Sequence, residues 1–203
     1  MHRKNKKHVV IYGGSFNPPH RGHASAVKAL LDAFPCDEIW IMPSGERGDK
    51  RIGTSGRHRM RMLHIMRAEN FPKTKIPVKI SGFELRRRGL SNTYRTSRTL
   101  KRRHPSWTFS YLVGSDILKD VRARWVNGGK LYREARFVCL KVRGSPLPKK
   151  LPERFWLLDL RAAERRSDSG KVIRALVQRG VNIAPYVGSG VAAYIKKRGL
   201  YGR

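Results

Sequence analysis

The sequence contains few acidic residues, few cysteines and no long hydrophobic run. Asp and Glu account for 14 of its 203 residues against 45 Lys and Arg, which gives a formal net charge of +31. This imbalance attracts anionic partners of every kind. The two cysteines, Cys36 and Cys139, exclude a disulfide framework, and we expect two buried thiols in a reducing, cytoplasmic compartment. No apolar run approaches the ~20 residues that span a bilayer, so no membrane partner is expected.

The start of the chain is basic, and a short apolar run follows it. Residues 1–7 read Met-His-Arg-Lys-Asn-Lys-Lys, but the apolar run ends at Tyr12 and leads directly into two glycines. We interpret this run as the first strand of the fold rather than as part of an export signal.

The positive charge raises the question of nucleic-acid binding. Basic residues are spread over the whole chain, and Arg57, Arg59, Arg61 and Arg67 fall on several sides of one expected helix. The sequence has no zinc-ligand spacing and no RNA-binding aromatic signature that would define a reading surface. We therefore expect a solvated basic surface whose binding to RNA and DNA is non-specific and sensitive to salt.

Apolar patterns typical of strands and of helices alternate along the chain. This alternation predicts an α/β protein with a Rossmann-like fold, in which a mainly parallel sheet carries helices on both faces. We expect one domain over residues 1–203, with a C-terminal helical segment at about 169–203. Strands are expected at 9–12, 38–42, 78–80, 109–113, 137–141 and 155–159. Helices are expected at about 24–34, 57–69, 93–103 and 127–134, with Met60, Met62, Leu63 and Met66 facing inward.

The most informative segment follows the first expected strand. It reads Gly-Gly-Ser-Phe-Asn-Pro-Pro-His-Arg-Gly-His, from Gly13 to His23, and leads into an amphipathic helix. Glycine lets the backbone approach a phosphate closely, and a helix start presents free N–H groups and the positive end of its dipole. Two imidazoles stand at that same end and face one anion. A phosphate site is therefore expected at Gly13, Gly14, Ser15, Phe16, His20 and His23.

This segment resembles the signature of the HxGH nucleotidyltransferases, which move a nucleotidyl group from a nucleoside triphosphate onto a phosphate. Later segments follow the order found in bacterial nicotinate-mononucleotide adenylyltransferases, and the resemblance covers nearly the whole chain. Gly114 and Asp116 match the family's strand-ending Gly-x-Asp, which contacts the nucleotide; an Asp here can equally cap the next turn. Trp125 stands where the family has a tryptophan stacked on the pyridine ring, although a lone Trp also suits a core.

The C-terminal region resembles the family's phosphate-binding ending, with one departure. The run from Ser169 to Arg174, Ser-Gly-Lys-Val-Ile-Arg, matches a motif close to Ser-Ser-Thr-x-Ile-Arg that opens a helix and holds the triphosphate. A serine hydroxyl, helix N–H groups and an arginine together clamp a phosphate. Lys171 replaces the threonine, and we expect it to serve the triphosphate as a point charge of different geometry.

Two loops depart from the family pattern near the substrates. The family carries Pro-His-Lys after its second strand, whereas this chain keeps only the lysine, Lys50, which is expected to touch the triphosphate. Lys50 belongs to a polar, glycine-rich loop over residues 44–55, in which Ser44 is expected to contact the mononucleotide. Where the family has Ser-Tyr-Thr beside the pyridine carboxylate, this chain has Ser-Asn-Thr, so Thr93 alone carries over. Nicotinate and nicotinamide both stay open as the acceptor ring.

The resemblance implies an adenylyltransferase in which the 5′-phosphate of a pyridine mononucleotide attacks the α-phosphate of ATP and pyrophosphate leaves. By the same resemblance, His20 and His23 stabilise charge on the phosphates, while Arg174 and Ser169 hold the β/γ end. Mg²⁺ enters with ATP, bound chiefly by phosphate oxygens and water. Two alternatives stay open: an HxGH transferase that uses pantetheine phosphate or CTP, and a nucleic-acid-binding derivative that kept the fold and lost the chemistry.

Overall fold

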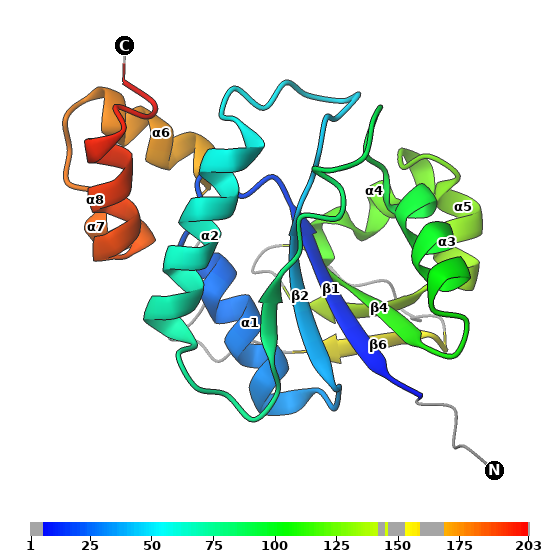
Figure 1. Ribbon diagram of the computed structural model, residues 1–203. Helices are drawn as coiled ribbons and strands as arrows, with labels where there is room; N and C mark the ends of the chain where they lie inside the picture. Colours follow the sequence, from blue (N-terminus) through cyan, green and yellow to red (C-terminus); the bar gives the residue numbers. More distant parts are fainter. Residues whose placement is uncertain (1–5, 142–144, 146–152, 159–168, 203) are drawn as a thin grey trace.

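The computed structural model describes residues 6–141, 145, 153–158 and 169–202, and its central feature is a six-stranded sheet (Figure 1). The strands lie in the order β3-β2-β1-β4-β5-β6, and all neighbours run parallel, so the expected mainly parallel sheet is confirmed. All six expected strands are present, and Asp159, the last residue expected in the sixth, lies outside the described residues. The strands are β1 (His8–Gly14), β2 (Glu38–Pro43), β3 (Val78–Ile80), β4 (Thr108–Gly114), β5 (Arg136–Leu140) and β6 (Phe155–Leu158).

Helices connect each pair of consecutive strands from β1 to β5, as parallel pairing requires. The four helices expected before the C-terminal segment are present, the structure adds two short helices directly after β4, and the C-terminal segment contains three helices among its described residues. In the part of the chain that the structure describes, no helix combines the length and the apolar character needed to cross a membrane. The helices are α1 (Arg21–Ala33), α2 (Gly56–Asn70), α3 (Thr93–Arg103), η1 (Ser115–Ile117), α4 (Leu118–Ala123), α5 (Gly128–Glu134), α6 (Gly170–Gln178), α7 (Ala184–Val187) and α8 (Ser189–Lys197).

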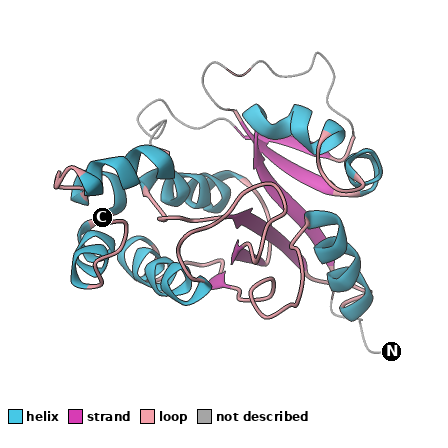
Figure 2. Cartoon of the chain, turned by 90° about the horizontal axis from the view of Figure 1, so that it is seen from above, coloured by secondary structure: helices cyan, strands magenta, loops and turns pink. Residues whose placement is uncertain are grey.

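Alternating side chains of the strands build a hydrophobic core on each face of the sheet. On β1, Val10 belongs to the core that contains residues of α1, α2 and the C-terminal helices. Val9 and Ile11 point the other way and belong to the core that contains residues of α3, α4 and α5. The result is a layer of helices on either side of the sheet, which Figure 2 shows from above.

Two expectations about burial are wrong in detail. Met62 and Met66 of α2 are buried, but Met60 is only half-buried, because residues two positions apart on a helix point in directions about 200° apart. Cys139 is buried in β5, whereas Cys36 is half-buried in the short connection between α1 and β2. Both cysteines are free thiols.

Glu38 is one of the few acidic residues, and it is buried at the start of β2. Lys7 and Lys79 both form ion pairs with its carboxylate, and Trp40 Nε1 donates to Oε2 at 2.7 Å. Burial alone would raise the pKa of this carboxyl, but hydrogen bonds from the two lysines and Trp40 bring it to about 2. This single carboxylate therefore links the entry to β1, β2 and β3 at the amino-terminal edge of the sheet.

The order of the strands also predicts where a ligand lies. The chain progresses outward from β1 through β2 to β3, and then returns to pair β4 on the other side of β1. In open parallel sheets, ligands bind outside the carboxyl ends of the strands where the order reverses. The segments that leave β1 at Gly14 and β4 at Gly114 border that place.

Candidate active site

Residues 13–23, here called the motif turn, form a compact turn packed around one aromatic ring. Phe16 adopts a φ of 47°, and its side chain is 1 % exposed. A Cβ atom at Gly14 would lie 3.2 Å from this ring, which explains why glycine suits the position. The ring also packs edge-on against the imidazole of His23, with centroids 4.8 Å apart. The buried ring of Phe16 thus supports the turn to which it belongs.

His20 and His23 lie together at the first turn of α1, with ring centroids 3.6 Å apart. His20 is the N-cap residue, and its backbone N–H donates to Nδ1 of His23 at 3.1 Å. This bond assigns the proton of a neutral His23 ring to Nε2. Burial, and then the neighbouring His20 ring, lower the pKa of His23 well below its usual value. His23 is therefore a neutral hydrogen-bond donor at neutral pH.

Two buried serine hydroxyls mark the ends of β1 and β2. Among the residues that the structure describes, neither Ser15 Oγ nor Ser44 Oγ has a hydrogen-bond partner. The Ser44 backbone N–H donates to the Gly14 carbonyl at 2.8 Å, which holds the two strand ends together. Because buried hydroxyls are almost always hydrogen-bonded in proteins, these two are candidates for contact with a ligand.

The N-terminus of α6 lies against the motif turn. Arg174 Nη1 donates to the Asn17 carbonyl oxygen at 2.7 Å, and a Cβ atom at Gly170 would lie 2.7 Å from that same oxygen. The Ser169 hydroxyl caps the helix by accepting from the Val172 N–H at 3.3 Å. The N-terminal ends of α1 and α6 therefore meet near Asn17, and both dipoles favour an anion there.

The end of the chain closes over the same turn. The Tyr201 hydroxyl donates to Asn17 Oδ1 at 2.7 Å. Burial raises the pKa of Tyr201 to about 12, so this phenol keeps its proton at neutral pH. Helix α8 is in turn fixed to α2, because Glu69 Oε1 accepts from the Gly190 backbone N–H at 2.6 Å. Asn17 is thus held from the C-terminal segment through both its carbonyl and its side chain.

Arg59 corrects the expectation that the basic residues of α2 are all solvated. It is 3 % exposed, and its guanidinium donates to the Ser15 carbonyl at 2.9 Å and to the Thr54 carbonyl at 3.2 Å. Arg59 precedes Met62 by three residues, so both share the buried face of the helix. It connects the motif turn to the end of the loop that follows β2.

The predicted residues after β4 divide between two places. Gly114 ends β4, and Asp116 lies exposed in η1. Burial, and then the charge of Asp116, raise the pKa of the Tyr12 hydroxyl on β1, so this carboxylate lies near the motif turn. Trp125 instead packs on the core of the α3–α5 side, and Thr93 opens α3 on that same side.

The two predicted lysines are both exposed. Partial burial, and then the charge of Arg47, lower the pKa of Lys50, and Arg174 contributes in the same direction. Lys50 therefore lies within electrostatic range of Arg174, and its contact with a triphosphate stays a prediction. Lys171 occupies the first turn of α6 beside Ser169, and its contact with a triphosphate stays a prediction.

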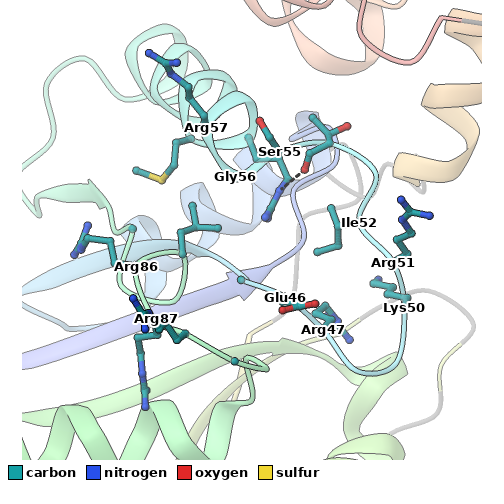
Figure 3. Close-up of a pocket in the computed structure, with 18 of the residues that line it drawn as sticks. Glu46, Arg47, Lys50, Arg51, Ile52, Ser55, Gly56, Arg57, Arg86 and Arg87 are labelled. Carbon is teal, nitrogen blue, oxygen red and sulfur yellow. Dashed lines mark hydrogen bonds between the residues drawn. The ribbon is translucent and has the colours of Figure 1, made fainter.

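A cavity of about 1180 Å³ lies beside the motif turn, between the loop after β2 and the loop after β3 (Figure 3). Seven arginines and one lysine line it, and we call it the arginine-rich cavity. Of the predicted site residues, Lys50 alone is part of its lining. The charge is thus less evenly scattered than the sequence predicts, because residues 45–59 and 82–89 bring their cations together only in the folded chain.

Sequence analysis did not identify Asn17, Arg59 and Tyr201 as the side chains that fix the motif turn. The bond from Tyr201 joins residues 184 positions apart, and the bond from Arg59 to Ser15 spans 44 positions, so neither leaves a local pattern. Helical periodicity would have found Arg59, because it falls on the same face as Met62. No local feature of the sequence indicates the partner of Tyr201.

Comparison with known proteins agrees with this geometry. Residues 11–176 match the family described as cytidylyltransferase-like. The protein of Geobacillus kaustophilus named "Probable nicotinate-nucleotide adenylyltransferase" is 32 % identical over 96 % of this chain and 86 % of its own length. A protein of the same name from Myxococcus xanthus is also 32 % identical, over 96 % of this chain and 94 % of its own length.

Solved structures extend the likeness to three dimensions. The structure of Plasmodium falciparum nicotinic acid mononucleotide adenylyltransferase complexed with NaAD has a TM-score of 0.85 at 25 % identity, covering 96 % of this chain and 97 % of that chain. The structure complexed with APC has a TM-score of 0.82 at 23 % identity with the same coverage, and shares the fold. The chain belongs to the cytidylyltransferase-like family and, within it, to the nicotinate-nucleotide adenylyltransferases.

Proposed function

We propose that the protein joins the AMP moiety of ATP to nicotinate mononucleotide, which gives the dinucleotide and pyrophosphate in NAD biosynthesis. The observation that carries this proposal is the pair of imidazoles, His20 and His23, in contact at the N-terminus of α1 in a chain of this family. Relatives that match nearly the whole chain are named for this reaction, which favours it over transfer to pantetheine phosphate or from CTP.

The reaction needs positioning more than proton transfer. An oxygen of the mononucleotide's 5′-phosphate forms a bond to the α-phosphorus of ATP, and the bond from that phosphorus to the β-phosphate bridging oxygen breaks. The attacking oxygen is already anionic at neutral pH, so no general base is required. The protein's task is to hold two anions in line and to stabilise the charge that moves to the pyrophosphate.

The two histidines are proposed to face the phosphates of ATP. His23 is neutral and offers Nε2–H as a hydrogen-bond donor. It would stabilise charge on a phosphate through one oriented hydrogen bond and not through a positive charge of its own. His20 would contact the same phosphates from the N-cap position. Backbone groups from Gly13 to Phe16 would line the path of the triphosphate.

The C-terminal segment is proposed to hold the β/γ end of ATP. Arg174 donates one hydrogen bond to the motif turn. A guanidinium has further N–H donors, which would form a bidentate contact with a phosphate. Ser169 and Lys171 stand at the start of the same helix, and Lys50 approaches from the loop after β2. Gly114 and Asp116 would bind the nucleoside on the β4 side.

The mononucleotide is proposed to lie toward β4 and α3. Ser44 would use its buried hydroxyl for the mononucleotide, while Thr93 and Trp125 would form the ring site on the α3–α5 side. This placement keeps the acceptor on the opposite side of the motif turn from α6. The two substrates would then meet at the motif turn.

Magnesium is proposed to enter as part of the substrate, bound to ATP. Apart from the carboxylate of Asp116, the groups described around the motif turn are mainly imidazoles, guanidinium groups and backbone N–H groups, which suit phosphate oxygens better than a hard cation. Within the described residues, no group of three His, Cys, Asp or Glu side chains could hold a metal ion. Phosphate oxygens and water would therefore supply the ligands of Mg²⁺.

The proposal treats residues 1–203 as one nucleotidyltransferase domain whose segment at about 169–203 completes the phosphate site. The free thiols Cys36 and Cys139 are compatible with a reducing compartment, and we propose the cytoplasm. The net charge of +31 supports an additional, non-specific binding of nucleic acid that weakens with salt.

Pyrophosphate release from ATP tests the proposed reaction. The full chain is assayed with MgATP and, in parallel, with nicotinate mononucleotide or nicotinamide mononucleotide at equal concentrations. We expect nicotinate to be preferred by at least about 10-fold, because one charge-assisted contact to its carboxylate is worth that much. Equal rates with both acceptors would overturn the choice of nicotinate.

Two further acceptor arms separate the proposal from its alternatives. Pantetheine phosphate with ATP, and CTP with a phosphorylated alcohol, should release pyrophosphate no faster than a control without acceptor. Release with either of these and not with a pyridine mononucleotide would assign a different transferase activity. No release with any acceptor would overturn the catalytic role altogether.

A further inference from the structure

The arginine-rich cavity borders the site described above, with which it shares Lys50, and its other lining residues belong to neither the motif turn nor α6. Its lining combines the loop after β2, the first turn of α2 and the loop after β3. Figure 3 shows Arg86 on one side of this space and Arg51 on the other. A volume of about 1180 Å³ is sufficient for a ligand larger than a single phosphate ion.

Positive charge in the cavity is in large excess over negative charge. Its lining contains seven arginines and one lysine but only two acidic residues, Glu46 and Asp49. Asp49 is already neutralised, because Arg47 binds it through two hydrogen bonds of 2.7 and 2.5 Å. Arg59 is engaged with backbone carbonyls, but Arg51, Arg57, Arg86 and Arg88 are exposed.

The backbone is shaped to bring these charges close. A Cβ atom at Gly82 would lie 2.8 Å from Nη1 of Arg86, so the glycine lets this guanidinium lie against the chain. The N-terminus of the 15-residue helix α2 begins at Gly56 in the lining, and its dipole adds to the positive potential. Partial burial, and then the charge of Arg47, lower the pKa of Lys50, to which Arg174 contributes in the same direction.

The cavity lacks what a nucleobase would need. None of the described residues that line it is aromatic, and its apolar members are Ile52, Met60 and Leu85. Proteins bind the bases of single-stranded nucleic acids largely by stacking on aromatic rings. Guanidinium groups, by contrast, match phosphate groups through paired N–H donors. The lining therefore favours a ligand made of phosphates without bases.

We propose that the arginine-rich cavity is a second anion site that binds a chain of three or more phosphates, distinct from the site that holds ATP. The shared chemistry is the linear phosphate chain, which either a free inorganic oligophosphate or the tail of a nucleotide could supply. The free oligophosphate fits this lining better because no surface for a base accompanies the cations. Lys50 belongs to both this site and the proposed triphosphate site, so the two sites are neighbours. Binding at the second site does not depend on the proposed reaction.

Calorimetric titration with inorganic tripolyphosphate at about 0.15 M salt tests this site. The full chain is titrated with and without saturating α,β-methylene-ATP, which fills the nucleotide site. We expect one equivalent of tripolyphosphate to bind in the presence of the analogue. Loss of all tripolyphosphate binding when the analogue is present would assign the ligand to the nucleotide site and overturn the proposal.

Matched charge variants locate the binding. The variant Arg86→Gln/Arg87→Gln/Arg88→Gln should weaken tripolyphosphate binding by at least about 10-fold, since each charge-assisted contact is worth more than 1 kcal/mol. The control Lys196→Gln/Lys197→Gln/Arg198→Gln removes three exposed cations at the end of α8 and should change the affinity by less than about 2-fold. Equal weakening by both variants would reduce the effect to net charge and overturn the site.

A second variant and a competitor complete the test. If the first triple variant unfolds, Arg51→Gln/Arg57→Gln removes two exposed cations from the loop after β2 and the first turn of α2, and should again weaken binding by about 10-fold. A single-stranded RNA at the same salt should not displace tripolyphosphate. Full displacement by RNA, lost in the same variants, would make the cavity a nucleic-acid site instead.

Discussion

The motif turn and the arginine-rich cavity both face anions, but they are built in opposite ways. The motif turn is made of one contiguous segment whose donors are imidazoles and backbone groups, fixed by Phe16 beneath and by Asn17 contacts above. The cavity is made of long cationic side chains from two loops and a helix start, and most of them are exposed. The motif turn offers donors in fixed orientations, whereas the cavity offers a high density of positive charge.

This difference separates two physical tasks. Fixed neutral donors stabilise charge at one defined point, cost no reorganisation during a reaction and are little affected by salt when they are buried. Exposed cations attract anions over longer distances, but their effect is screened by ions in solution. We therefore expect the motif turn to control turnover and the basic surface to control salt-dependent binding.

Salt should separate the motif turn from the basic surface of the protein, with the largest effect expected here. Binding of random-sequence RNA and DNA should fall by about 1000-fold between about 50 mM and about 200 mM salt, because counterion release is its driving force. Adenylyl transfer should change far less over the same range. Fluorescence anisotropy and pyrophosphate release, followed in one salt titration, measure both. A tight, sequence-selective complex that persists at about 0.15 M salt would show that the basic surface itself reads nucleic acid.

Removing an imidazole from the motif turn should lower turnover by about 100-fold or more. His20→Ala and His23→Ala each remove a donor aimed at the phosphates, and such donors typically carry that much of the rate. His64→Ala is the control, because His64 is exposed on α2. Steady-state kinetics at saturating substrates and a thermal unfolding curve are measured for all three. Near-parental turnover in either variant would remove that histidine from the reaction.

Loosening the clamp on Asn17 should have a smaller effect, of up to about 10-fold. Tyr201→Phe removes one hydroxyl and its 2.7 Å bond to Asn17, a loss of about 1 kcal/mol. We expect the KM for ATP to rise while the KM for the mononucleotide stays constant, because the clamp supports the ATP side. Tyr186→Phe removes a phenol from the same C-terminal segment and should leave both constants unchanged. A parallel change in both constants would mean that Tyr201 only stabilises the fold.

Restoring the family's threonine should have the smallest effect, of about 3-fold in the KM for ATP. Lys171→Thr exchanges an exposed positive charge for a hydroxyl at the first turn of α6. The KM for the mononucleotide should not move, and Lys197→Thr, which removes an exposed lysine from α8, should change neither constant. Kinetics with each substrate varied in turn decide this. No effect of Lys171→Thr on either constant would remove Lys171 from the ATP site.

The fold was predictable because each strand and helix has a characteristic pattern of apolar residues within its own short segment. The strand β3 and the helix α3 have the expected bounds, and the alternation of strand and helix periods indicates parallel pairing. The burial of individual side chains was less predictable, because residue type alone does not decide which face of a helix is buried. Met60 and Arg59 are adjacent on α2, yet the arginine is buried and the methionine faces the cavity, because Arg59 finds two carbonyl partners.

The part of the candidate site that comes from one sequence segment was predictable. The parts that combine distant segments were less so. The motif turn carries its own glycines, histidines and helix start, so its place followed from the sequence alone. The arginine-rich cavity joins residues 45–59 to residues 82–89, and neither segment by itself differs from the basic background. The roles of Thr93, Trp125 and Lys171 rest on the resemblance to the family and on the tests above.

The two bonds to Asn17 have a consequence for biosynthesis. Arg174 and Tyr201 lie 157 and 184 positions further along the chain than their common partner. A growing polypeptide can assemble β1, β2 and their helices early, since protein domains acquire structure from the N-terminal side during translation. The motif turn around Asn17 nevertheless acquires its last described restraint only after Tyr201 has left the ribosome. Nascent chains should therefore form much of the sheet before they become able to retain a nucleotide.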